Sequence, residues 1–388
     1  MKNPVVTLHL FVTIVFCPSM AMSQGKTKFS LKDSLDHKLD LSDWIINANG
    51  FIPVPVIITE PALGNFGFGI APVFLKKKPP IVTDGKATPV PPDITAAAAA
   101  YTLNKTWFLG GGRMATIPKL RLRYKIGGGY ANVNMDYYRE IASQGEKQFG
   151  FNLKTILAYG YLGRQLHDPR FQVGIQYLSL NVKLKLQNGS QLPDFVKDKE
   201  VKSNVGELGV VGEYDSRDNI FTPDRGVKLH AHVNFSDNIF GSSYDYQRLN
   251  SYMYWYVPVF HRKESGKNWI SGFRVDYQQM FGDPPFFIVP YIDLRGIPTM
   301  RYQGKVNILA ETEQRWDFVR RWSLLAFGGL GKAFNDYSEF GDAELVYNYG
   351  AGFRYLLARK FKLRCGIDIA RGPGNWAYYI VFGSYWRK

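Results

Sequence analysis

The chain has 388 residues, of which 45% are apolar, 21% charged and 15% aromatic, and its formal net charge is +15. This composition excludes a polytopic helical membrane protein, because a spanning helix needs about 20 consecutive apolar residues and only the N-terminus approaches such a run. The aromatic content also excludes a disordered chain, and two cysteines are too few for a disulfide-stapled secreted fold.

The first residues have the pattern of an export signal. Lys2 precedes an apolar run over 5–16, and small residues then offer cleavage after Ala21 or Ser23. The run is too short to span a bilayer, so residues 1–23 are predicted to be a signal peptide that is removed. The mature protein is therefore expected outside the cytoplasm.

Cys17 allows an alternative, which is lipid attachment, although the bulky Phe16 before it does not suit that processing step. If Cys17 leaves with the signal peptide, Cys365 is the only thiol of the exported protein. Residues 24–50 are expected to form a short segment before the first strand.

From residue 51 onward, apolar and polar residues alternate with the period of a β-strand. Over 305–318 the even positions are mostly apolar and end in Trp316 and Phe318, whereas the odd positions carry most of the charge. Over 249–259 apolar residues alternate with tyrosines, and Ser251 is the one exception on the apolar face.

Sixteen such runs are predicted, and together they form one domain over 51–388. A spacing of about 21 residues suits a membrane-spanning strand of roughly 9 to 11 residues and its turn. The Lys- and Pro-rich stretch between the second and third runs is predicted to be a loop. The runs are 51–60, 66–75, 94–103, 105–116, 121–139, 149–164, 171–185, 204–218, 225–237, 244–259, 268–281, 303–318, 322–333, 345–357, 361–372 and 376–386.

A soluble β-sandwich would also alternate, but three features favour an all-β protein that is a transmembrane antiparallel barrel of about 16 strands. The strands are long, aromatic residues lie near their ends, and the signal exports the chain to an outer membrane. The last predicted strand has Phe382 and Trp386 on its lipid-facing side. This closing strand is expected to pair with the first strand.

Three motifs stand out between residues 205 and 388. The first is the turn after the eighth predicted strand, and the second is Leu294-Arg295-Gly296-Ile297 before the twelfth. The third is Glu313-Gln314-Arg315-Trp316, followed by Phe327-Gly328-Gly329-Leu330-Gly331. In content, order and spacing they resemble the bacterial surface antigen superfamily, the outer-membrane barrels that include the central subunit of the β-barrel assembly machinery. The turn motif consists of Asp215, Arg217, Asp218, Asn219, Pro223 and Gly226.

The resemblance implies a sixteen-stranded barrel whose sixth extracellular loop folds into the lumen. In this sequence Arg295, followed by Gly296, would be the arginine of that loop. Glu313 would be its acidic partner and Phe327 its aromatic neighbour.

Two positions depart from the family pattern, because Gly329 replaces an aspartate and Ile297 replaces an aromatic residue. A buried guanidinium needs carboxylate partners. Glu313 is expected to be the main one, and Glu311 and Asp368 are available on neighbouring strands. The arginine would serve either as a structural pin for the loop or as a conformational latch.

Family members that assemble or secrete proteins carry periplasmic POTRA domains. The segment 24–50 is too short for such a domain. The chain is therefore expected to be a barrel-only member that relies on a POTRA-bearing partner or on the seam of the barrel.

The other candidate sites are predicted to have no catalytic or metal-binding role. The turn motif is rich in residues that bond their own backbone, so it is predicted to be structural. His230 and His232 share a strand face beside Lys228, where two imidazoles near an ammonium make an incomplete metal site. The sequence has no hydrolase elbow, zinc-protease motif or phosphate loop, so neither an enzyme nor a cofactor is predicted.

The positive charge is attributed to contact with anionic lipid headgroups, not to nucleic acid.

Three functions stay open at this point. The first is help in the assembly or translocation of outer-membrane components. The second is a passive channel or structural barrel. The third and least favoured is a barrel enzyme that acts on envelope lipid.

Overall fold

The computed structural model describes residues 30–47, 50–76, 78, 81–83, 86–88, 92–141, 145–187, 193–262 and 267–386. Sixteen strands form one antiparallel sheet in which each strand pairs with the next along the chain, apart from a small inserted hairpin. All sixteen predicted strands are confirmed. Their bounds are β1 Gly50–Ile58, β2 Gly67–Lys76, β5 Asp93–Thr102, β6 Trp107–Ile117, β7 Leu122–Ile141, β8 Gly145–Gln165, β9 Phe171–Leu186, β10 Lys202–Asp215, β11 Gly226–Ser236, β12 Tyr246–Arg262, β13 Lys267–Gly282, β14 Val306–Val319, β15 Trp322–Phe334, β16 Val346–Ala358, β17 Leu363–Gly372 and β18 Asn375–Phe382.

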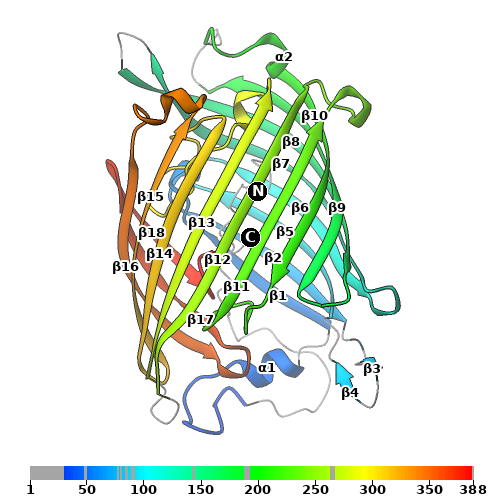
Figure 1. The fold of residues 1–388 in the computed structure, drawn as a ribbon, viewed down its shortest axis with the longest axis vertical. Coiled ribbons are helices and arrows are strands. Elements are labelled where there is room, and N and C mark those ends of the chain that lie inside the picture. Colours follow the sequence, from blue (N-terminus) through cyan, green and yellow to red (C-terminus); the bar gives the residue numbers. More distant parts are fainter. Residues whose placement is uncertain are drawn as a thin grey trace.

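The sheet curls into a barrel with two distinct ends (Figure 1). The lower end in the figure carries helix α1 (Ser42–Asn47) and the hairpin of β3 (Ile81–Thr83) and β4 (Lys86–Thr88), which lies within the stretch predicted to be a loop. The upper end carries α2 (Asp198–Val201). We call them the α1 end and the α2 end.

Six short 3-10 turns complete the secondary structure of the described ranges. None of the helices there is long and apolar enough to cross a membrane. The turns are Pro61–Leu63, Pro118–Leu120, Asn238–Phe240, Phe286–Ile288, Tyr337–Phe340 and Arg359–Phe361.

The barrel wall has an apolar outer face and a polar inner face. On β14, Trp316 is 53% exposed while its neighbour Asp317 is 1% exposed, and on β12 Trp255 is exposed while Tyr254 is buried. Successive side chains of a strand point to opposite faces, so one face of each strand lines the interior. The outward residues are those that alternation in the sequence assigned to lipid.

The interior is filled rather than open near the α2 end. There, Phe286, Phe287 and Ile288 of loop 283–305 pack against inward-facing apolar residues of β7 to β10. This loop is the sixth connection at the α2 end, and it folds into the barrel as expected. Along β13, β14, β16 and β17 the inner lining carries buried charged side chains instead.

The two edge strands of the sheet are β1 and β18. In the part of the chain that the structure describes, no backbone ladder joins them, so the expected pairing of first and last strands is not formed. We call this junction the seam.

The last strand is shorter than predicted. It ends at Phe382, and Gly383 with φ +76° then turns the chain out of the strand. Trp386 is only 2% exposed, so it is not on the lipid-facing side. Alternation did not reveal this turn, because Trp386 lies in phase with the aromatic face that Trp376, Tyr378 and Phe382 form.

Candidate functional site inside the barrel

Arg295 lies on loop 283–305 and is fully buried. Its Nε and Nη2 donate to Oε1 of Glu311 at 3.0 and 2.9 Å. Its Nη1 donates to Oε2 of Glu313 at 2.8 Å and to Oδ2 of Asp368 at 3.0 Å. Glu311 and Glu313 are two residues apart on β14 and therefore share its inner face, whereas Asp368 comes from β17. Three carboxylates from two strands thus hold one guanidinium.

Glu311 accepts more hydrogen bonds from Arg295 than Glu313, the residue that was expected to be the main partner, and which of them couples more strongly stays a prediction. The Glu311 side chain is fully buried and accepts two hydrogen bonds from Arg295, whereas the Glu313 side chain is 11% exposed and accepts one. Glu313 lies two residues nearer the α1 end of β14, away from the buried centre of the network. A buried charge-assisted hydrogen bond is stronger than one that water screens.

Two aromatic rings enclose the guanidinium. Its Cζ lies 3.4 Å from the ring centre of Phe327 on β15 and 4.7 Å from that of Tyr385. Both contacts are within the range of a cation–π interaction. The aromatic neighbour that the resemblance implied is therefore in contact, and a second one comes from the C-terminal residues.

Gly296 occupies a position that only glycine fits. Its φ is +85°, and a β-carbon there would lie 2.9 Å from the backbone nitrogen of Gly372. Its own backbone N–H donates to the hydroxyl of Tyr379 on β18 at 2.9 Å. The close approach of loop to strand explains why glycine follows the arginine.

The missing family aspartate has a structural explanation. A β-carbon on Gly329 would lie 2.8 Å from the carbonyl oxygen of Ala310 and 3.0 Å from Cδ2 of Leu294. Asp368 supplies an acid from β17 instead, and it also accepts from Arg354 at 2.5 and 2.9 Å.

The second departure, Ile297, belongs to an apolar cluster beside the network. The cluster consists of Ile292, Leu294, Ile297, Leu309 and Val346.

The residues after β18 turn into the barrel and join this network. Nε1 of Trp386 donates to Oε2 of Glu311 at 2.6 Å. The indole ring packs near Tyr254 and Tyr256 of β12, with ring centres 6.0 and 5.9 Å apart. We call Arg295, Glu311, Glu313, Asp368, Phe327, Tyr385 and Trp386 the inner lock.

Comparisons with known proteins identify the fold. No protein-family model and no curated protein matches the sequence. Among solved structures, BamA from Haemophilus ducreyi lacking POTRA domains 1–3 is 12% identical with a TM-score of 0.58, over 87% of this chain and 70% of that one. CdiB from Escherichia coli is 10% identical with a TM-score of 0.59, over 85% and 62% of the two chains. CdiB from Acinetobacter baumannii is 9% identical with a TM-score of 0.54, over 87% and 60%. This chain has the BamA and CdiB barrel fold.

The chain spans less than two thirds of either CdiB chain. At this level of identity the likeness concerns the barrel itself.

In this BamA-like barrel the turn motif lies between the eighth and ninth strands, β10 and β11, at the α1 end. Asp215 pairs with Arg217, and Oδ1 of Asp218 accepts the backbone N–H groups of residues 224 and 225. Oδ1 of Asn219 accepts from the backbone of residues 221 and 222, and Gly226 has φ +107°. These contacts are those of a structural turn.

The turn also crosses the α1 end of the BamA-like barrel. Pro223 O accepts from Nη1 of Arg315 on β14 at 3.2 Å, and Asp224 pairs with Arg315 and with Lys362. Burial raises the pKa of Asp224, but these two cations outweigh it and hold that pKa at about 2. The motif therefore joins strands that are far apart in sequence.

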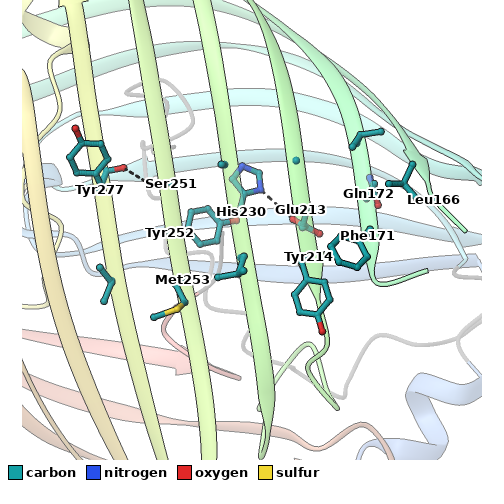
Figure 2. A pocket seen from close by; sticks show the side chains of 15 residues that line it. Leu166, Phe171, Gln172, Glu213, Tyr214, His230, Ser251, Tyr252, Met253 and Tyr277 are labelled. Carbon is teal, nitrogen blue, oxygen red and sulfur yellow. Dashed lines mark hydrogen bonds and ion pairs between the residues drawn. The ribbon is translucent and has the colours of Figure 1, made fainter. Parts of the chain in front are cut away.

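His230 and His232 lie on the inner face of β11, and Nε2 of His230 is 3.1 Å from Nδ1 of His232. Nδ1 of His230 is also 3.3 Å from Oε2 of Glu213 (Figure 2). No group of three or more His, Cys, Asp or Glu suited to a metal was found among the described residues. The wall beside them has an outer groove of about 580 Å³. It lies where Gly212, Ala231 and Ser251 stand in register on adjacent strands.

The sequence alone missed several members of the network. Arg354, Arg274 and Tyr385 lie within predicted strands, but no motif in the sequence singles them out. Arg274 pairs with Asp276, Asp293 and Glu311. The signal available was their inward position in the alternation, which shows that they are inside but not which of them meet.

Proposed function

We propose that this chain is an outer-membrane barrel of the bacterial surface antigen superfamily that assists the assembly or translocation of envelope components at the seam between β1 and β18. Its α1 end would face the periplasm. The proposal includes export by residues 1–23, which lie outside the described residues, as does Cys17.

The observation that supports the proposal is the contrast between the interior and the seam. Loop 283–305 fills the interior near the α2 end, and α2 covers it, because Oε1 of Glu200 accepts the backbone N–H of Phe286 at 2.9 Å. The inner lock holds the same loop through Arg295. The seam, in contrast, has edge strands with no ladder between them in the described residues. Unpaired strand edges are templates for pairing with another chain.

Two kinds of partner follow from this proposal. The outward apolar residues would contact membrane lipid, with lysines and arginines near the strand ends attracting anionic headgroups. Clients would be delivered by a periplasmic partner that bears POTRA domains. The proposal requires no nucleic acid and no cofactor.

Site-specific photocrosslinking in the native membrane tests the proposal. A photoreactive amino acid replaces either Tyr378 on edge strand β18, which is 44% exposed, or Trp255 on β12, which is 47% exposed and serves as the matched control. We expect adducts with envelope proteins at position 378 and only lipid adducts at position 255. The same adducts at both positions would contradict a role for the seam.

The alternatives have separate signatures. A large, steady conductance of the wild-type chain in a planar bilayer would identify a passive channel. Lipid turnover that is lost on changing a single Ser or His would identify an enzyme.

A further inference from the structure

The segment that precedes β1 lies against the outside of the barrel at the α1 end. The backbone N–H of Leu41 donates to Leu357 O at 2.8 Å, and the hydroxyl of Tyr355 donates to Leu39 O at 2.9 Å. Tyr355 on β16 is the register partner of Cys365 on β17, and two residues away the exposed Phe353 and Ile367 form another such pair on the outer face. Residues two apart on a strand share a face, so Tyr355 and Cys365 also lie on the outside. The segment therefore covers part of the outer face of β16 and β17. The covering side chains are Leu31, Leu41 and Ile45, and those beneath them are Tyr355, Leu357, Ala358, Phe361, Leu363, Cys365 and Phe382.

A buried ionic cluster fixes this segment to the turn between β14 and β15. Arg321 in that turn is 5% exposed and donates from Nη1 to Asp40 at 2.7 Å and from Nε to Asp36 at 2.7 Å. Its Nη2 donates to Asp33, and Arg359 also donates to Asp33 at 2.6 and 2.9 Å. Two arginines on barrel turns thus hold three carboxylates of the segment.

The same segment is linked to both sides of the seam, to β1 by the continuity of the chain and to β18 through an apolar cluster. Trp44 of α1 packs against the large apolar cluster whose members include residues of strands from β1 to β10 and of loop 283–305. The next residue, Ile45, and Phe382 of β18 both pack against the buried cluster of Leu41, Leu357 and Ala358. After α1 the chain enters β1 at Gly50. The segment is thus continuous with one edge strand and attached to turns beside the other.

Loop 283–305 bridges the seam in a similar way from inside the barrel. The hydroxyl of Thr299 donates to Oε1 of Glu60, which follows β1, at 3.0 Å. The backbone N–H of Gly296 donates to Tyr379 of β18 at 2.9 Å. Two bridges of different construction therefore connect edge strands that no ladder joins.

We propose that residues 30–47, here called the clasp, hold β1 and β18 together at the α1 end, and that release of the clasp lets these strands separate. This inference rests on the proposed function, in which envelope components are handled at the seam, and it adds that the clasp controls whether the seam can open. The ionic cluster is the part that can be released, because loss of Arg321 removes an ion pair from each of three carboxylates of the clasp and leaves Asp33 paired with Arg359.

Cys365 provides a built-in probe of the clasp because it lies beneath it. In a Cys17→Ser background of the full chain it is the only thiol. We expect Arg321→Ala to raise the rate of labelling of Cys365 by a water-soluble maleimide about tenfold or more, because local opening becomes more frequent. The matched control is Arg170→Ala, which removes an exposed arginine from the turn between β8 and β9 and should leave the rate unchanged.

A second measurement reports on the seam itself. Spin labels at Phe74→Cys on β2 and Ile380→Cys on β18, in a background without the two native cysteines, lie on opposite sides of the seam towards the α1 end. We expect Arg321→Ala to lengthen the distance between the labels and Arg170→Ala to leave it unchanged. The triple change Asp33→Asn, Asp36→Asn and Asp40→Asn should act like Arg321→Ala without altering any strand or turn of the barrel.

Each result decides the proposal. Unchanged labelling of Cys365 in Arg321→Ala and in the triple variant would show that the ionic cluster does not hold the clasp. Faster labelling with an unchanged label distance would show that the clasp covers the barrel without closing the seam. If both measurements respond as expected but position 378 gives no protein adducts, the clasp stands and the proposed function fails.

Discussion

The two oxygens of Glu311 have different partners, and this makes the residue central to the inner lock. Oε1 accepts from Arg295, while Oε2 accepts from Trp386 at 2.6 Å and from Nη1 of Arg274 at 3.5 Å. One carboxylate therefore connects loop 283–305, the C-terminal residues and β13. Removing its charge would leave buried cations with fewer partners, which costs more free energy than losing an exposed pair.

A double-mutant cycle tests which carboxylate matters most. Arg295→Ala and Glu311→Gln should each lower the free energy of unfolding by roughly 3 to 5 kcal/mol, because each breaks a buried pair. The double variant should lose less than the sum of the two single changes. Urea unfolding in detergent measures all three values.

The same cycle with Glu313→Gln is the comparison. Its coupling to Arg295→Ala should be smaller than that of Glu311→Gln, since Glu313 accepts one hydrogen bond and is partly exposed. Equal coupling for the two glutamates would mean that the network is held differently from what the distances indicate.

Gly329 allows a prediction about packing. Gly329→Ala should destabilise the barrel by about 1 to 3 kcal/mol, because the new β-carbon would overpack against Ala310 and Leu294. The control is Gly160→Ala on β8, where a β-carbon would meet nothing within 4 Å. Thermal unfolding followed by migration on unheated gels measures both, and a Gly329→Ala variant as stable as wild type would contradict the packing explanation.

At the scale of the strands, alternation sets which side chains meet lipid and which meet the lumen. Val210 of β10 is 56% exposed and outward, while its neighbour Val211 is buried. The β11 histidines and the β12 tyrosines follow the same rule on the inner face. A change of charge should therefore have opposite consequences at adjacent positions of one strand, because only one of them lies in a medium without water.

Val210→Arg tests the outer face. We expect it to lower the free energy of unfolding in lipid by about 2 to 4 kcal/mol, the range for arginine on a lipid-facing strand near the bilayer midplane. Ile239→Arg is the control, because Ile239 is 84% exposed in a turn at the α2 end. Equal stability of the two variants in lipid vesicles would show that Val210 does not face hydrocarbon.

At the scale of the whole molecule, contacts between segments distant in sequence close the α1 end. The turn that contains Asp224 reaches Arg315 and Lys362, and the clasp reaches Arg321 and Arg359. The ion pairs among these contacts need ionised carboxylates, so we expect this end of the barrel to respond to acid. The inner lock, by comparison, is shielded from solvent at its centre.

Acidification should release the clasp before it unfolds the barrel. Hydrogen bonds from Arg359 to Asp33 and from Arg321 to Asp36 hold the pKa values of these carboxyls below the usual range, and the pKa of Asp40 is also lowered, although burial opposes this. A lowered pKa contributes stability that is fully present above the pKa of the unfolded state, about 3.9 for aspartate, and is lost as the pH falls below it. Arg321 and Arg359 stay charged throughout.

The measurement is the fluorescence anisotropy of a dye at Leu35→Cys, a 60% exposed position of the clasp, in a background without the native cysteines. Anisotropy should stay constant from pH 7 to about 4 and fall only as the pH is lowered further, below the unfolded-state pKa of aspartate. In Arg321→Ala it should already be low at pH 7 and should change little. A pH-independent anisotropy in the otherwise unchanged chain would show that the carboxylates do not hold the clasp.

The number of strands, their order and their two faces could be predicted from the sequence alone. Successive side chains of a strand point to opposite faces, so every second residue has the polarity that suits one side of the wall. All sixteen runs became strands, and the turn motif lay between the eighth and ninth as the resemblance implied. Arg295 and a set of acids near it were also named in advance, because a buried guanidinium requires carboxylates.

Only the tertiary structure decided which of these groups meet. Asp368 lies 73 residues from Arg295, and Asp33 lies 288 residues from Arg321. Such pairs depend on how strands are placed around the barrel, and alternation gives the side of the wall on which a residue lies but not its height or its neighbours. The inward turn after Phe382 was hidden for the same reason, since one glycine with a positive φ changes the direction of the chain without changing the pattern of side chains.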